Sequence, residues 1–311
     1  MRFKFYASTL FFFLLGVFIT WESRAQEVTF KSLIEDMTSR ASIAKYPDPA
    51  FTLEQASSYD RRAKSPDQNW FANKDNANFV ATEMINGRKE FVLLDTKNPG
   101  AVVRFWMTLA GKNSGAGTLR FYFDGADTAA IAGKPRKILG GATSMMGYPF
   151  TGSEPQQSHF ERRGYNLYMP LPYGKGCKIT YQSDRVDPDD PNNSNAVFYV
   201  INYRKYDQET KVKTFSTDLL NTHRRLLSDA KHQLYTQHFY PEESTTSESW
   251  EEETIAAGSQ KTFTLDGERA INRIKLKLEA KNRDAALRRT IMKMEFDGKS
   301  TVWAPVGDFF G

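Results

Sequence analysis

Apolar and polar side chains alternate with a period of two in several segments of the chain after Glu90. The alternation is clearest over residues 102–109, 119–123 and 197–203, and it is typical of half-buried β-strands. Turn-forming clusters separate these segments: Asn98 to Gly100, Lys112 to Gly117, Asp124-Gly125 and Asp187 to Asn195. No strands alternate with helices, which disfavours a parallel sheet. We therefore expect a mostly β protein, built as an antiparallel jelly roll or β-sandwich.

Two segments show helical spacing instead. The first, residues 32–41, predicts a short helix. The second predicts one long helix over residues 217–236, because these apolar residues share one face: Leu219, Leu220, Leu226, Leu227, Ala230 and Leu234. His223 lies on the same face, so we interpret it as a packed histidine rather than a catalytic one. Residues 59–78 are polar and aperiodic, and they predict a long loop.

The strand pattern of residues 103–125 recurs at residues 274–298. Each copy has an alternating strand (103–105 and 274–276), a polar loop, a second strand and a Phe-Asp-Gly turn. The acidic, Ser/Thr-rich residues 241–253 read as a linker between a first jelly-roll domain, 26–240, and residues 254–311. Since the second copy stops at Gly311 soon after its turn, we expect an incomplete second jelly roll in a truncated chain.

The first 25 residues have the features of a cleavable signal peptide. Arg2 and Lys4 form a basic start, residues 6–20 are apolar, and small residues precede a cleavage site after Ala25. The apolar run is about 15 residues long and a spanning helix needs about 20, although a retained membrane anchor stays the alternative. We expect a secreted or periplasmic protein without stable membrane insertion.

Composition and charge argue against nucleic-acid binding, an internal disulfide and an EF-hand site. The net charge of +5 is mild and interspersed, which argues against nucleic-acid binding. The single Cys177 cannot form an internal disulfide, and we expect a buried thiol. Residues 187–192 offer oxygen ligands for Ca²⁺ but lack the pattern of an EF-hand, so a solvated loop is the better interpretation. We predict no metal and no cofactor.

Familiar catalytic signatures are absent: there is no G-x-S-x-G, HExxH, zinc-type Cys spacing or phosphate loop. The densest candidate cluster is Tyr59, Asp60 and Arg61. A Tyr ring can stack on a sugar, and Asp and Arg can bind hydroxyl groups. Trp106 lies on the polar face of its strand. We predict that these four residues line a saccharide site; the alternative for residues 59–61 is a capped turn with a salt bridge.

Several motifs, in this order, resemble those of one family. They are Ser57 to Arg61, Pro99 to Thr108, Leu119 to Gly125, Tyr168 to Tyr173, Cys177 to Ile179, Phe198 to Tyr203 and Ala304 to Gly311. Together they resemble the domain of unknown function 2961, now glycoside hydrolase family 172, over residues 50–311. The chain departs from the family pattern at residues 62–70, which leaves the glycan specificity open.

The resemblance implies a double jelly roll, trimer-based homo-oligomers and exo-acting hydrolysis of fructofuranosides or D-arabinofuranosides with retention. Retention uses two carboxyl groups about 5–5.5 Å apart. The family pattern places both catalytic glutamates beyond the position of Gly311, so no catalytic residue is assigned. The alternatives are a non-catalytic glycan-binding or envelope scaffold protein and, third, a defective remnant.

Overall fold

The computed structural model describes residues 27–111, 114–141, 144–154, 164–189, 195–236, 254–268, 271 and 274–311. The predicted signal peptide and the predicted linker lie outside these ranges, and the domain boundaries stay a prediction. The chain divides into two compact units, Met1–Ser247 and Glu248–Gly311, which are described separately. None of the helices within the described ranges has the length and apolar character needed to span a bilayer.

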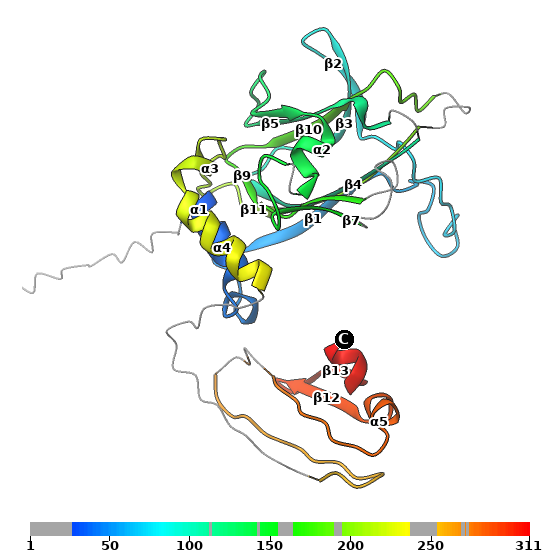
Figure 1. Ribbon diagram of the computed structural model, residues 1–311. Coiled ribbons are helices and arrows are strands. Elements are labelled where there is room, and N and C mark those ends of the chain that lie inside the picture. The colour runs from blue at the N-terminus through cyan, green and yellow to red at the C-terminus, as the bar shows by residue number, and fades with distance from the viewer. Residues whose placement is uncertain are drawn as a thin grey trace, which may run out of the picture. The chain divides into compact units, whose positions relative to one another are not determined.

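The first unit contains two antiparallel sheets in separate layers (Figure 1). The first sheet has the order β1-β11-β4-β8-β7, and β9 also pairs with β4. Its strands are β1 (Phe51–Ser57), β4 (Gly100–Ala110), β7 (Thr151–Glu154), β8 (Gly164–Leu167), β9 (Leu171–Tyr173) and β11 (Ala196–Tyr206). The two longest strands, β4 and β11, are neighbours at its centre and match the predicted segments 102–109 and 197–203.

The second sheet has the order β2-β3-β10-β5-β6. Its strands are β2 (Ala81–Ile85), β3 (Arg88–Thr96), β5 (Thr118–Phe123), β6 (Ile131–Gly133) and β10 (Cys177–Gln182). Alternate residues of both sheets point into one core, where the rings of Phe105 and Phe121 meet edge to face with centroids 6.1 Å apart. The predicted antiparallel β-sandwich is confirmed.

Short helices complete the first unit, and α1 and α4 lie side by side at one end of it (Figure 1). The helices are α1 (Phe30–Thr38), η1 (Ser42–Ala44), η2 (Ser114–Ala116), α2 (Pro135–Leu139), α3 (Leu219–Thr222) and α4 (Arg224–Thr236). Helix α1 begins earlier than predicted, because Thr29 caps it through a reciprocal hydrogen-bond pair with Ser32.

The single helix predicted over residues 217–236 is wrong: the segment forms two helices that meet at His223. The backbone leaves helical geometry there, with φ −103° and ψ 26°, although His223 still donates to the carbonyl of Leu219 at 2.9 Å. The His223 ring packs against Phe30 with centroids 6.0 Å apart, in agreement with the prediction of a packed histidine.

The described residues of the second unit form one hairpin and two helices: α5 (Arg283–Arg289), β12 (Ile291–Phe296), β13 (Lys299–Pro305) and α6 (Val306–Phe310). The strand predicted at residues 274–276 is absent. Ile274 and Leu276 are exposed at 37% and 50%, and no described strand lies alongside to pair with them. An isolated extended segment has no ladder hydrogen bonds to hold it as a strand.

The repeated Phe-Asp-Gly turn has the same backbone geometry in both units. Asp124 and Gly125 have φ values of 57° and 77°, and Asp297 and Gly298 have values of 50° and 74°. Two successive positive φ angles are typical of a type I′ turn, which favours Asp-Gly. Asp124-Gly125 begins the longer connection of β5 to β6, residues 124–130, whereas Asp297-Gly298 is the whole connection of β12 to β13. Each hairpin leads into a short helix, α2 or α6.

Candidate functional site

The long loop predicted over residues 59–78 is confirmed, and it leaves the first sheet where β1 ends at Ser57. Ser58 fixes the departure point: its amide donates to the Tyr199 carbonyl at 3.0 Å, and its Oγ accepts from the Tyr199 amide at 3.1 Å. Further along, the Asn78 side chain donates to the Ser58 carbonyl at 2.9 Å. The two ends of the loop are therefore bound to each other and to β11.

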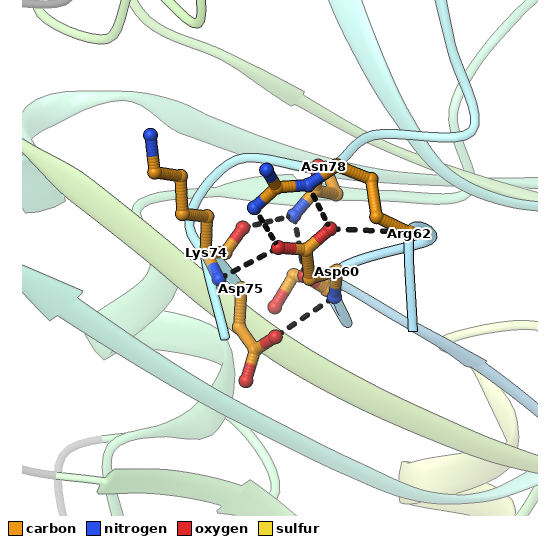
Figure 2. A network of polar contacts seen from close by, with 6 residues as sticks. Asp60, Arg62, Lys74, Asp75 and Asn78 are labelled. Atoms are coloured by element: carbon orange, nitrogen blue, oxygen red, sulfur yellow. Dashed lines mark hydrogen bonds and ion pairs between the residues drawn. The ribbon is translucent and has the colours of Figure 1, made fainter. Parts of the chain in front are cut away.

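Asp60 is the centre of a polar network inside this loop (Figure 2). One carboxylate oxygen accepts from the Arg62 amide at 3.1 Å and from Arg62 Nε at 2.9 Å. The other accepts from Arg62 Nη2 at 2.5 Å and from the Lys74 amide at 2.9 Å. The Asp60 amide donates to Asp75 Oδ1 at 2.8 Å. Residues 14 and 15 positions apart are thereby held together.

The same contacts determine the charge of Asp60. Hydrogen bonds from the Arg62 side chain, and then from the Lys74 amide, lower the pKa of the Asp60 carboxyl far below its usual range. Such bonds favour the charged form. Asp60 is only 4% exposed, and four donors occupy its oxygens. Asp60 is therefore an ionised carboxylate that holds the loop together through Arg62, Lys74 and Asp75; we call this network the Asp60 clasp. Because its oxygens are already occupied, Asp60 suits neither the role of a general acid nor that of a nucleophile.

Arg61 and Tyr59, the two chain neighbours of Asp60, make separate contacts. Arg61 Nη1 donates to the Asn78 carbonyl at 2.9 Å, and Nη2 donates to the Ser57 carbonyl at 3.4 Å. The guanidinium lies 5.2 Å from the centroid of the Tyr59 ring, within the range of a cation–π contact. Tyr59 remains 52% exposed. The ring is thus held at one side and open to solvent, as a stacking surface requires.

Trp106 lies on the face of β4 that points away from the core. Its neighbours Phe105 and Met107 are fully buried between the sheets, and successive side chains of a strand point to opposite faces. In the register, Ser57 is opposite Val200, and Val200 is opposite Trp106. With strands about 4.8 Å apart, the Ser57 and Trp106 backbones are about 10 Å apart.

The structure places the predicted residues in two locations. Arg61 donates to the Asn78 carbonyl, which also accepts from the hydroxyl of the core residue Tyr199, whereas Trp106 lies in the middle of β4, and no contact links it to residues 59–61 among the described residues. Tyr59 and Arg61 follow the last residue of β1, and Trp106 lies two strands away on the outer face. Asp60 belongs to the same loop, but its carboxylate is turned into the clasp. The sequence interpretation missed Lys74 and Asp75. The only signal for them was the Asp- and Asn-rich composition of residues 59–78.

Other carboxylates of the first unit are held by cations. Glu54 accepts from Lys205 Nζ at 3.0 Å, and this hydrogen bond is the main cause that lowers the pKa of Glu54. Glu90 is completely buried, and it accepts from Arg88 Nε at 3.0 Å and from the Tyr122 hydroxyl at 3.0 Å. Glu90 is therefore closed to a substrate by burial, and Glu54 is already paired with a lysine.

The ranges that the structure covers contain no group of three or more His, Cys, Asp or Glu side chains placed to hold a metal ion. In the segment considered for Ca²⁺, Asp187 accepts from the Asp189 amide at 3.1 Å, and residues 190–192 lie outside the described residues. Cys177 is buried, as predicted, and burial raises the pKa of its thiol.

Comparison with known proteins gives one family. A sequence model described as the GH172 first beta-sandwich domain matches residues 49–223. The match begins before β1 and ends after α3, so it includes both sheets and all four predicted site residues. Among curated proteins, no significant match to the chain is found.

Proposed function

Because the chain belongs to glycoside hydrolase family 172, we propose that it binds a furanoside of the fructofuranose or D-arabinofuranose type through residues 59–61, in the loop after β1, and Trp106, on β4. One observation carries the proposal: the Tyr59 ring is held by Arg61 at 5.2 Å, yet it is half exposed. A fixed aromatic ring loses little entropy on binding, which favours stacking on a sugar.

The proposed reaction of the active protein is exo-acting hydrolysis with retention. It needs two carboxyl groups about 5–5.5 Å apart, one as nucleophile and one as acid and base. Asp60, Glu54 and Glu90 are each held by cationic side chains. These three carboxylates are therefore given no catalytic role, the catalytic residues stay unassigned, and residues 59–61 and Trp106 are proposed to contribute binding in a trimer-based homo-oligomer.

Binding is tested by calorimetric titration of the whole chain with fructofuranose and D-arabinofuranose oligosaccharides. Tyr59→Ala should weaken saturable binding about tenfold, in line with the loss of an aromatic stacking contact. Tyr46→Ala is the matched control, because Tyr46 is 99% exposed in the same unit and should leave affinity unchanged. Equal affinities of all three proteins would contradict the proposed site.

A second candidate is a non-catalytic glycan-binding or envelope scaffold protein. The locked Asp60 carboxylate favours it, because four donors already occupy this acid beside the candidate ring. The two candidates separate in one assay: a hydrolase releases free sugar from an oligosaccharide that it binds, and a scaffold protein binds the same oligosaccharide without cleavage.

Export is the remaining part of the proposal. Its support is the basic start, the apolar run and the small residues before Gln26. N-terminal sequencing of the protein recovered from the culture medium or periplasm should begin at Gln26. Recovery of an intact N-terminus in the membrane fraction would favour a retained anchor instead.

A further inference from the structure

Five residues form one row across the outer face of the first sheet. Ser57 is opposite Val200, Val200 is opposite Trp106, Trp106 is opposite Asn166, and Asn166 is opposite Gly152. The row therefore crosses β1, β11, β4, β8 and β7 in order. None of the five side chains is charged, so the row suits a neutral ligand.

Asn166 is the unusual member of this row. Its chain neighbours Tyr165 and Leu167 belong to the core, which places Asn166 on the outer face beside Trp106. It is nevertheless only 8% exposed. Within the described residues its carboxamide makes no hydrogen bond to any other group. A carboxamide offers two donors and an acceptor. The carboxamide of Asn166 is not among the unpartnered groups that the described chain seals from solvent, so these donors and the acceptor are accessible to a ligand.

Gly152 leaves room next to this carboxamide. Gly152 is itself buried in the sheet, yet a Cβ added to it would meet no atom within 4 Å. Its φ is not positive, so the backbone does not require glycine at this position. The missing side chain instead leaves space on the β7 side of Asn166, while Trp106 borders Asn166 on the β4 side.

We propose that Trp106, Asn166 and the space over Gly152 form a subsite for one neutral sugar ring. The indole provides a flat apolar surface, and the carboxamide binds two neighbouring hydroxyl groups, donating to one and accepting from the other. The inference rests on the proposed function and extends it by naming the neighbours of Trp106 that would bind the sugar on the outer face of the sheet.

Polar side chains continue along the same face beside the row. Asn202 donates from its carboxamide to Gln55 Oε1 at 3.1 Å, and it accepts from Arg104 Nη1 at 3.4 Å. These two carboxamides and the guanidinium already have partners, in contrast to Asn166. Asn166 therefore differs from these neighbours in that its carboxamide makes no hydrogen bond among the described residues.

The test uses titration of the whole chain with the same two oligosaccharides. Asn166→Ala should weaken binding about tenfold, as expected for the loss of two neutral hydrogen bonds. The thermal midpoint of Asn166→Ala should stay at the wild-type value, because the carboxamide has no hydrogen-bond partner among the described residues. Gly152→Val should abolish sugar binding, because the valine side chain fills the space beside Asn166. The thermal midpoint of this variant should also stay at the wild-type value.

Asn76→Ala is the matched structural control. Asn76 Oδ1 accepts from the Val197 amide at 2.8 Å, so this variant should lower the thermal midpoint. If Asn166→Ala lowers the midpoint in the same way, or if both site variants bind like the wild type, the subsite is wrong. In the second case, weakened binding by Tyr59→Ala would preserve the proposed function. A wild-type chain that binds neither sugar would overturn both proposals.

Discussion

The hairpins β5–β6 and β12–β13 share a turn sequence but differ in their surroundings. Phe123 and Phe296 precede the two Asp-Gly turns, and they are 4% and 44% exposed. The first hairpin belongs to a five-stranded sheet that packs on a second sheet, whereas the second forms a two-stranded sheet. The backbone of the turn is thus a local property of Asp-Gly, while burial of the preceding ring requires partner strands.

The turn aspartates show the same difference. Asp124 Oδ1 accepts from the Lys175 amide at 2.6 Å and from the Gly176 amide at 3.3 Å, and Oδ2 is hydrogen-bonded to Thr214. The side chain of Asp297 makes no hydrogen bond to any described residue. In the first unit the turn therefore also binds two distant segments, a role that the sequence of the turn alone does not determine.

The largest expected effect comes from the two rings. Phe123→Ala should destabilise the first unit by about 3–5 kcal/mol, because it removes a buried aromatic side chain and leaves a cavity. Phe296→Ala should change stability by no more than about 0.5 kcal/mol, as is usual for an exposed position. Urea unfolding followed by circular dichroism measures the free energy of unfolding of both variants. Equal losses of unfolding free energy would show that Phe296 is buried in solution.

Charged pairs should give the next largest contrast. Glu90 is fully buried against Arg88, Arg120, Tyr122 and Thr180. Glu90→Gln should cost about 1–3 kcal/mol, because it leaves buried donors facing a neutral group.

Glu279→Gln is the matched change in the second unit. Its partner Lys277 lies at 2.6 Å, but both side chains are about four-fifths exposed, at 83% and 78%. Exposed pairs contribute about 0–1 kcal/mol. In the same urea titrations, Glu90→Gln should therefore lower the free energy of unfolding much more than Glu279→Gln does. The reverse order would contradict the burial of Glu90.

These contrasts explain which parts of the fold follow from the sequence. Strands β4, β5 and β11 follow from alternation, because each has one buried face. Residues 274–276 show the same alternation but form no strand, since pairing needs a partner that alternation does not specify. The break at His223 is similar: the apolar stripe continues through it, and only the local backbone geometry marks the end of α3.

The candidate site divides in the same way. Tyr59 follows from an aromatic residue in a polar loop, and Trp106 follows from an aromatic residue on the more polar face of an alternating strand; both are local patterns. The clasp of Asp60 depends on Lys74 and Asp75, which lie in an aperiodic loop and give no spacing signal. Asn166 is a single polar residue between two core residues, and the sequence alone does not mark it as a binding residue. Only the strand register, which places it between Trp106 and Gly152, indicates that role.

A smaller effect tests whether the turns are locally equivalent. Gly125 and Gly298 have φ values of 77° and 74°, and a Cβ at either would meet no atom within 4 Å. Alanine at each position should therefore cost only backbone strain, about 1–2 kcal/mol. Hydrogen exchange of the hairpin amides measures each unit separately. If only Gly125→Ala reduces the protection of its hairpin amides from exchange, the second turn does not hold its positive φ in solution.

The smallest effect near neutral pH concerns Asp60. Its folded pKa is depressed, chiefly by hydrogen bonds from Arg62, so the unfolded chain takes up the proton first as the pH falls. The stabilisation is therefore complete at neutral pH and declines below about pH 5, as the pH passes the unfolded pKa and continues toward the folded one. Urea midpoints at pH 7, 5 and 4 should show a steeper decline in the wild type than in Asp60→Asn. The urea midpoint of Asp297→Asn should fall with pH as that of the wild type does, because the Asp297 side chain has no described hydrogen-bond partner. Equal falls of the urea midpoint in all three proteins would contradict the Asp60 clasp.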